Sequence, residues 1–248
     1  MIRIHCSYHK CLTKYFINVM HNVYNRSHTA TWKYQHFNSL IDEFYRHFAR
    51  LTVSSINNHA LDLARLGDDA RITRFIRDPR DLIVSGYFYH RRGAETWCNG
   101  SNPKKKDWQV VNGCVPSGMD HDQSFSSYLQ NVSREKGLLA ELEFRTSHFE
   151  SMVEWPLDDA RIRIFRYEDI IGHEREVFSS IFSHYALPAA DAAIAMYCAE
   201  ELSANRRAKD TAHIRNPVPG QWRQYFTPKV NEHFQDRYRH LLDIYGYD

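Results

Sequence analysis

The chain has 248 residues, of which 43% are hydrophobic and 25% are charged. We expect a single domain over residues 1–248, because this length suits one large α/β domain and the apolar content is too high for extensive disorder. No apolar run reaches 18 residues, so no membrane-spanning segment is expected. The formal net charge is only +2, and no nucleic-acid recognition motif occurs, so nucleic acid is not an expected partner.

The cysteines indicate a reducing environment. They are Cys6, Cys11, Cys98, Cys114 and Cys198, an odd number without regular spacing. The first residues of the sequence lack the apolar run of a signal peptide. We therefore expect a cytoplasmic protein in which the cysteines are small core residues. His5, Cys6, His9 and Cys11 match no zinc-binding spacing, and we expect no metal site.

The amino-terminal part alternates predicted strands with predicted helices. A short apolar strand over Ile2–Cys6 leads into a helix whose apolar residues recur at helical spacing from Leu12 to Val23. A second helix is predicted from Ser39, and a second strand over Leu51–Ile56. A strand, a turn and a helix therefore follow one another directly at the start of the chain.

The same alternation continues further along the chain. A strand over Arg71–Ile76 precedes a helix that Asp78 is expected to cap, with Pro79 at its first position. Another helix is predicted from Ser124 and another strand over Ile162–Phe165. Alternating strands and helices predict an α/β fold, a three-layer αβα arrangement with a mainly parallel central sheet. Ligands of such sheets bind beyond the carboxyl ends of the strands.

Residues 93–123 interrupt this alternation, because they contain no apolar period. A segment of this length without regular structure is usually a lid, a binding loop or disorder. We interpret it as a loop insertion. Trp97 and Trp108 are candidates for the aromatic walls of a substrate site, whereas Lys104–Lys106 are expected to be solvated.

The segment 75–87 carries the clearest binding signal. Arg77 lies just before the predicted capped helix and Ser85 lies two turns into it, where both can reach a single anion. Between Arg71 and Arg92 there are six arginines against two aspartates, and between Arg206 and Lys229 six basic residues against one aspartate. Two separate basic clusters suit a ligand with two phosphate-like ends.

The pattern Arg-x-Pro-x-Asp-x-x-Val-Ser in this segment resembles the 3′-phosphate-binding element of sulfotransferases that use 3′-phosphoadenosine 5′-phosphosulfate (PAPS). The turn after the first strand resembles the 5′-phosphosulfate loop of that family, Pro-Lys-Ser-Gly-Thr-Thr-Trp. The positions of this loop fall, in order, on His9, Lys10, Cys11, Leu12, Thr13, Lys14 and Tyr15. Leu12 replaces the glycine, and we expect it to present its N–H group only if its φ is negative.

A third segment, residues 213–227, resembles the carboxyl-terminal motif of the family, Arg-Lys-Gly-x-x-Gly-Asp-Trp-Lys-Asn-x-Phe-Thr. Arg215, Gly220, Trp222, Phe226 and Thr227 fall at matching positions, and Asn216 replaces the lysine. The resemblance implies that Arg215, Asn216 and Gly220 belong to a loop that closes over the 3′-phosphate. It also implies that Tyr167, in a Tyr-Glu-Asp sequence after a strand, contacts adenine, and that Tyr15 stacks on the other face of the base.

The resemblance covers roughly residues 2–227 and implies transfer of a sulfuryl group from PAPS to a hydroxyl or amine of a small-molecule, sugar or lipid acceptor. No metal is required, because the transferred group carries less charge than a phosphoryl group. Lys10 neutralises the bridging oxygen as the bond breaks. His59 occupies the place of the catalytic base of cytosolic sulfotransferases, and Glu43 is the second choice, because carbohydrate sulfotransferases use a glutamate.

Two other functions remain open on the sequence. One is a nucleotide-dependent small-molecule kinase with a degenerate phosphate loop, although the sequence G-K-[ST] is missing. The other is a catalytically inactive nucleotide-binding module, which the departures at Leu12, Lys14, Asn57 and Asn216 make conceivable. Binding of 3′,5′-adenosine diphosphate (PAP) without transfer to any acceptor favours the latter.

Overall fold

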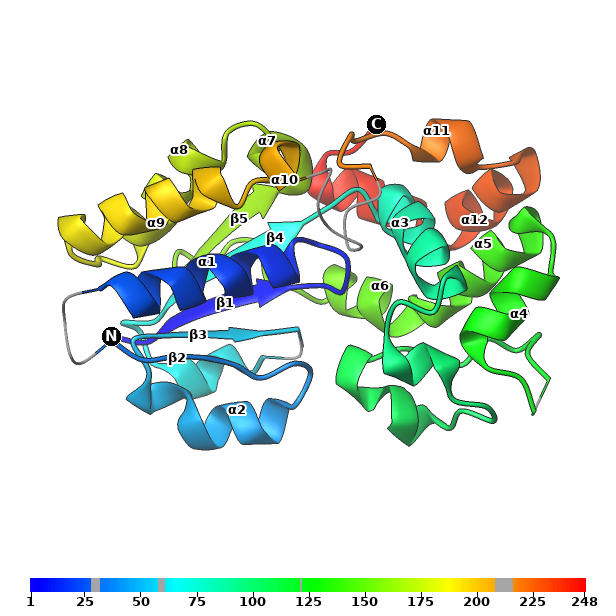
Figure 1. The fold of residues 1–248 in the computed structure, drawn as a ribbon, viewed down its shortest axis with the longest axis horizontal. Helices are drawn as coiled ribbons and strands as arrows, with labels where there is room; N and C mark the ends of the chain where they lie inside the picture. Colours follow the sequence, from blue (N-terminus) through cyan, green and yellow to red (C-terminus); the bar gives the residue numbers. More distant parts are fainter. Residues whose placement is uncertain (28–31, 58–60, 121, 208–215) are drawn as a thin grey trace. The chain divides into compact units, whose positions relative to one another are not determined.

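The structure, a computed structural model, describes residues 1–27, 32–57, 61–120, 122–207 and 216–248. It divides into two compact units. The first unit comprises residues 1–76 and 156–217, and the second comprises residues 77–155 and 218–248. Figure 1 follows the chain through both units by colour. The single domain expected over the whole chain stays a prediction, and each unit is described by itself.

A five-stranded sheet forms the centre of the first unit. Its strands are β1 (Arg3–Ser7), β2 (Tyr34–His36), β3 (Val53–Ile56), β4 (Arg71–Ile76) and β5 (Ile162–Arg166). They lie in the order β2-β3-β1-β4-β5, and every neighbouring pair is parallel. The predicted α/β fold with a mainly parallel sheet is therefore confirmed. All strands end at the same edge of the sheet, as the arrowheads of β1 and β3 show in Figure 1.

Helices flank this sheet. They are α1 (Thr13–Arg26), α2 (Ile41–His47), α7 (Tyr167–Ile170), α8 (Glu174–His184), α9 (Ala189–Glu201) and α10 (Ala204–Arg207), with 3-10 turns at Phe48–Arg50 and Leu63–Leu66. Phe16 of α1 stacks on His5 of β1 with ring centroids 3.6 Å apart, and it also stacks on Phe178 of α8. This apolar layer fixes α1 and α8 against the sheet, because close-packed rings exclude water from both elements.

His5 is a core residue. Its Nδ1 lies 3.0 Å from Thr73 Oγ1, and burial holds the pKa of the imidazole well below its usual value. The ring is therefore neutral. In the same unit, burial raises the pKa of the Cys6 thiol to about 12, which makes it an unreactive core residue.

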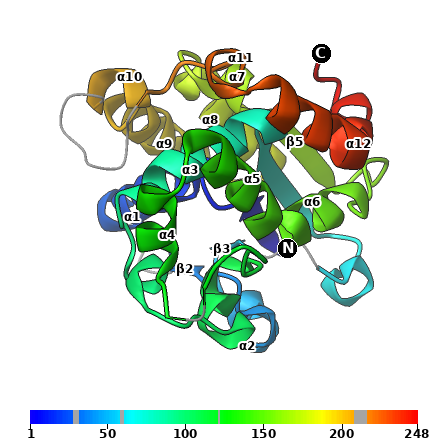
Figure 2. The same cartoon turned by 90° about the vertical axis from the view of Figure 1, so that its right-hand side faces the viewer.

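The second unit is helical. Its helices are α3 (Pro79–Arg91), α4 (Phe125–Asn131), α5 (Arg134–Phe144), α6 (Thr146–Val153), α11 (Trp222–Tyr225) and α12 (Pro228–Tyr245), with 3-10 segments at Thr96–Asn99 and Lys105–Val111. Figures 1 and 2 both show α4 and α5 beside α3. Asp78 caps α3 by accepting a hydrogen bond from Arg80 N at 2.9 Å, and Pro79 is the first helical residue, as predicted.

Residues 93–120 have more structure than their lack of apolar periodicity predicts. Trp108 is fully buried, and its ring lies against Phe125 and Phe144 with centroids 5.2 and 5.7 Å away. Trp97 stacks on Phe144 at 5.4 Å. The expectation that Trp108 lines a substrate site is wrong, because its ring belongs to the aromatic core of the second unit.

A buried polar cluster joins α3 to α5 beside this aromatic core. Glu141 Oε1 forms an ion pair with Arg145 Nη2 at 3.0 Å, and the other carboxylate oxygen lies 2.7 Å from His90 Nδ1. All three side chains are inaccessible to solvent. Gly86 of α3 makes room for the carboxylate, because a Cβ atom there would lie 1.8 Å from Glu141 Oε1.

We expect Gly86→Ala to lower the free energy of unfolding by about 2 kcal/mol or more, because the methyl group displaces a buried carboxylate in a packed core. Urea unfolding followed by circular dichroism measures this loss. Gly100→Ala is the matched control, since the nearest atom to an added Cβ there is 4.0 Å away. Equal stability of the two variants would contradict the packing argument.

Candidate functional site

The turn between β1 and α1 is built from left-handed backbone. Lys10 has φ 71° and Leu12 has φ 57°, and Cys11 N donates a hydrogen bond to Tyr8 O at 2.9 Å. A negative φ at Leu12 was predicted as the condition for presenting its N–H group, and this condition is not met, because the residue takes the left-handed conformation that glycine adopts. A residue with this φ is strained unless it is glycine, so the leucine retains the backbone geometry that a glycine adopts freely. The tight turn requires it, because α1 begins at the next residue.

The amino-terminal end of α1 is suited to an anion. No acidic side chain lies in its first turn, and Leu12 provides no side-chain cap. The Thr13 hydroxyl lies 2.7 Å from Ser7 Oγ and donates to Tyr8 O at 3.0 Å, which fixes the start of the helix. Unsatisfied N–H groups and the helix dipole favour negative charge at this position. Lys10 is half-buried and Lys14 is exposed beside it.

The other loop residues are more deeply packed. Cys11 is fully buried. The Tyr15 hydroxyl donates to Ala199 O at 2.7 Å, and its ring lies edge-on to Phe178 at 5.7 Å. Burial raises the pKa of the Tyr15 phenol. Tyr15 therefore joins α1 to α8 and α9, and its contact with a base stays a prediction.

Arg74 of β4 lies next to this turn, and no role was predicted for it. Its guanidinium group donates a hydrogen bond to the hydroxyl of Tyr8, a residue of the turn, and both side chains are fully buried. Its charge is close enough to Cys6 to oppose the burial-driven rise of the thiol pKa. Arg74 thus adds positive potential behind the turn. The sequence feature that could have pointed to this role is an arginine inside a predicted apolar strand.

In the second unit, Arg77 lies two residues before α3 and Ser85 lies two turns into that helix. Asp81 and Ser85 are four residues apart within α3, which places them on one side of the helix. Arg77 is 4% exposed, and its Nη2 lies 4.0 Å from Asp81 Oδ2. Ser85 is half-buried. The side chain of Arg77 therefore lies next to Asp81, which shares one side of α3 with Ser85.

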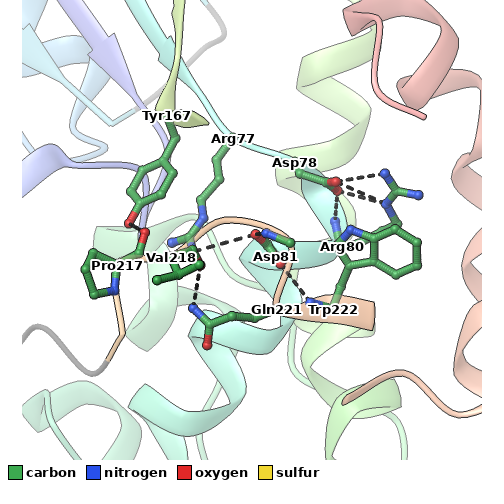
Figure 3. Close-up of polar contacts among 10 residues, drawn as sticks. Arg77, Asp78, Arg80, Asp81, Tyr167, Pro217, Val218, Gln221 and Trp222 are labelled. Carbon is green, nitrogen blue, oxygen red and sulfur yellow. Dashed lines mark hydrogen bonds and ion pairs between the residues drawn. The ribbon is translucent and has the colours of Figure 1, made fainter. Parts of the chain in front are cut away.

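Asp81 holds the carboxyl-terminal loop of the second unit. Its two carboxylate oxygens accept hydrogen bonds from Gly220 N at 2.6 Å and from Trp222 N at 2.9 Å (Figure 3). Gly220 has φ 79°, which explains the glycine at this position. Burial raises the pKa of Asp81, while Arg77 and both N–H groups oppose that rise. No role was predicted for Asp81, although it lies in the sequence motif, because its partners are 139 and 141 residues away.

The same loop is also held by a stacked tryptophan. The Arg80 guanidinium lies 3.8 Å from the centroid of the Trp222 ring and is paired with Asp78 at 2.8 Å. Cation–π stacking of this kind contributes about 0.5–2 kcal/mol. Gln221 Nε2 donates to Val218 O at 2.9 Å within the loop (Figure 3).

Tyr167 follows β5 in the first unit, as predicted. It is buried, and its hydroxyl donates to Pro217 O at 2.7 Å (Figure 3). Asn216 is exposed beside this proline.

Glu43, the second choice for a base, lies half-buried in the first turn of α2. His59 and Arg215 lie outside the described residues.

The Sulfotransferase domain family matches residues 5–246 of the chain. The chain belongs to the sulfotransferase family. Mouse sulfotransferase SULT7A1 complexed with PAP has a similar fold, with TM-score 0.51 and 16% identity over 97% of this chain and 83% of that chain. Retinol dehydratase in complex with retinol and PAP gives TM-score 0.51 and 14% identity over 96% and 80%. No curated protein sequence matches significantly.

Family membership makes this protein a sulfotransferase and bears out the resemblance seen in the sequence. Within the described parts of the sulfotransferase, no three or more His, Cys, Asp or Glu side chains are grouped to hold a metal ion. No helix among the described residues is both long and apolar enough to cross a membrane.

Replacing Leu12 tests the left-handed turn. We expect Leu12→Gly to be more stable to unfolding than Leu12→Ala by about 1 kcal/mol, because only glycine adopts this φ without strain. Asn18, in the middle of α1, is the control, because there alanine is expected to be more stable than glycine by a similar amount. The same order of stability at both positions would contradict the geometry of the turn.

Replacing Asp81 tests the attachment of the loop. We expect Asp81→Ala to raise the hydrogen-exchange rates of the Gly220 and Trp222 amides on the order of tenfold or more, because each loses a buried acceptor. Exchange measured by NMR or mass spectrometry gives these rates. Asp236→Ala, an exposed aspartate of α12, should leave them unchanged. Unaltered exchange in Asp81→Ala would show that other contacts hold the loop.

Proposed function

We propose that this sulfotransferase uses PAPS as the donor and transfers its sulfuryl group to a hydroxyl or amine of a small organic acceptor. The observation that carries the proposal is the turn after β1, where left-handed residues lead into the uncapped, acid-free first turn of α1 next to Lys10. These groups fit a phosphosulfate, because they combine oriented N–H groups with a positive side chain.

The loop residues have separate roles in this proposal. The amides of Leu12 and Thr13 bind the 5′-phosphosulfate, and Cys11, Lys14 and Tyr15 complete this end of the site, with the Cys11 amide closing the turn on Tyr8 O. When bound, PAPS supplies the activated sulfuryl group. Lys10 stabilises the negative charge that develops on the 5′-phosphate side of the breaking bond.

The remaining contacts are assigned to the nucleoside and the 3′-phosphate. Arg77 and Ser85 bind the 3′-phosphate, with the guanidinium group as the bidentate partner. Arg215, Asn216 and Gly220 belong to the loop that covers this phosphate, and Tyr167 contacts adenine. The hydrogen bonds from Gly220 and Trp222 to Asp81 support the loop assignment, because they hold its backbone against the helix that carries Ser85.

The acceptor is proposed at the level of its class. Retinol dehydratase is described in complex with retinol, a small apolar alcohol, and PAP. We extend this class to the present protein and assign His59 as the base that deprotonates the acceptor, with Glu43 as the alternative. All five cysteines are free thiols, which agrees with a location in the reducing cytoplasm.

Calorimetric titration of the protein with PAP, compared with ATP and Mg²⁺, tests the donor. We expect micromolar affinity for PAP and much weaker binding of ATP, because only PAP has a 3′-phosphate for Arg77. Preference for ATP with Mg²⁺ would favour a kinase. PAP binding without sulfate transfer to any member of a panel of small alcohols, phenols and amines, retinol included, would favour an inactive binding module.

We expect Arg77→Ala to weaken PAP binding at least about 100-fold, because a charge-assisted bidentate contact is lost. Titration of the variant with PAP measures the change, and circular dichroism checks that the fold is retained. Arg91→Ala, an exposed arginine of the same helix, is the matched control and should bind like the wild type. PAP affinity unchanged in Arg77→Ala would remove the 3′-phosphate assignment.

A further inference from the structure

Tyr8 is the first residue after β1 and lies at the base of the turn that leads into α1. Its carbonyl oxygen accepts two hydrogen bonds, one from Cys11 N at 2.9 Å and one from the Thr13 hydroxyl at 3.0 Å. The first bond closes the turn, and the second attaches the first residue of α1. A single main-chain carbonyl therefore holds both the turn and the start of the helix that follows it.

The side chain of Tyr8 is held by a neighbouring strand. Arg74 of β4 donates a hydrogen bond to the Tyr8 hydroxyl, and its guanidinium carbon lies 5.2 Å from the centroid of the tyrosine ring. Both side chains are fully buried. Hydrogen bonds with a charged donor are among the stronger polar contacts in proteins. Tyr8 is thus fixed at both ends, by β4 at its hydroxyl and by the turn at its carbonyl.

The turn is held from both faces of the sheet. His5 of β1 stacks on α1, so Ser7, two residues further along the strand, also faces α1. Ser7 Oγ lies 2.7 Å from the hydroxyl of the first residue of α1. Arg74 pairs in the register with Cys6, whose side chain alternates with these and faces away from α1. Tyr8 and Arg74 therefore support the turn from the face that α1 does not cover.

This support explains how the turn keeps a strained backbone. Lys10 and Leu12 have φ 71° and 57°, and neither is glycine. Residues in this conformation persist only where the surrounding structure determines their geometry. Cys11 lies between them, and its bond to the carbonyl of Tyr8 is a constraint of this kind. The direction of the N–H groups at the start of α1 therefore depends on the position of Tyr8.

We propose that Tyr8, held by Arg74, is a positioning residue for the 5′-phosphosulfate, because it fixes the direction of the Leu12 and Thr13 N–H groups. This inference rests on the proposed PAPS-dependent function. Arg74 acts on the anion through Tyr8 rather than by contact. The 3′-phosphate is assigned to other residues, so the pair affects one end of the nucleotide and not the other.

The affinities for PAP and for adenosine 3′-phosphate test this role, because the two nucleotides differ only in the 5′-phosphate. We expect Tyr8→Phe to weaken PAP binding about tenfold or more and to leave adenosine 3′-phosphate within about twofold of wild type, because a loosened turn is no longer pre-organised for the anion. Calorimetric titration measures both affinities. Tyr185→Phe is the matched control: its buried hydroxyl donates to Ile4 O of β1 at 2.8 Å, before the turn, so both affinities should stay unchanged.

Hydrogen exchange of the Cys11 amide measures the state of the turn without a ligand. We expect Tyr8→Phe to raise this rate about tenfold or more, because the acceptor of the amide is no longer fixed. Tyr185→Phe should leave the rate unchanged.

A double-mutant cycle tests whether Arg74 acts through Tyr8. Adding Tyr8→Phe to Arg74→Met should lower the PAP affinity no further, because the two changes remove one interaction. Circular dichroism checks that Arg74→Met folds. If it does not, the affinities and the exchange rate of Tyr8→Phe decide the question.

The outcomes separate the two proposals. Absence of PAP binding by the wild-type protein contradicts the donor assignment and this inference with it. Unchanged PAP affinity or unchanged Cys11 exchange in Tyr8→Phe overturns the positioning role and leaves the donor assignment intact. So does an equal loss for both nucleotides, an equal loss in Tyr185→Phe, or additive losses in the double variant. A loss confined to PAP, together with faster exchange at Cys11, supports the inference.

Discussion

Parallel pairing of the five strands is the constraint on which the chemistry of the first unit depends. Since all strands run the same way, their carboxyl ends lie at one edge, and whatever follows each strand is placed there. The turn that contains Lys10 and Leu12 follows β1, and Tyr167 follows β5. These residues are far apart in the sequence, so no local pattern shows that they lie at one edge. The ladder of main-chain hydrogen bonds brings them to it.

In the second unit, a buried carboxylate, Asp81, lies near the start of α3 beside residues that are proposed to bind an anion. Under the proposed assignment, an anion bound by Arg77 and Ser85 would lie next to Asp81, whose carboxylate repels it. The two N–H donors and Arg77 offset this charge, and they oppose the rise of the Asp81 pKa that burial causes. The aspartate thus remains in an anion-binding motif because its charge is directed to the backbone of the loop. Arg80 and Trp222 add a second attachment of that loop to the same helix.

Sequence patterns predicted the elements that have local signals. The strand over residues 71–76 and the capped helix that begins at Pro79 were found because apolar runs and caps are local. β2 was missed because three residues, Tyr-Gln-His, are too short to show a period. The folded state of residues 93–120 was missed because Trp108 packs on Phe125 and Phe144 rather than on close neighbours in sequence. For the site, the sequence indicated which residue types are present, but it did not indicate which residues they contact.

Leu12 replaces the family's glycine in the turn between β1 and α1. At this position the backbone conformation matters more than the side chain. An anion at a helix start is bound by N–H groups, and their direction depends on φ and ψ rather than on the residue type. Leu12 adopts φ 57° and ψ 16°, so it leads into α1 as a glycine would. The strain of a left-handed leucine costs about 1–2 kcal/mol of folding free energy. The departure from the family pattern therefore weakens the fold slightly and keeps the backbone geometry that the proposed anion site needs.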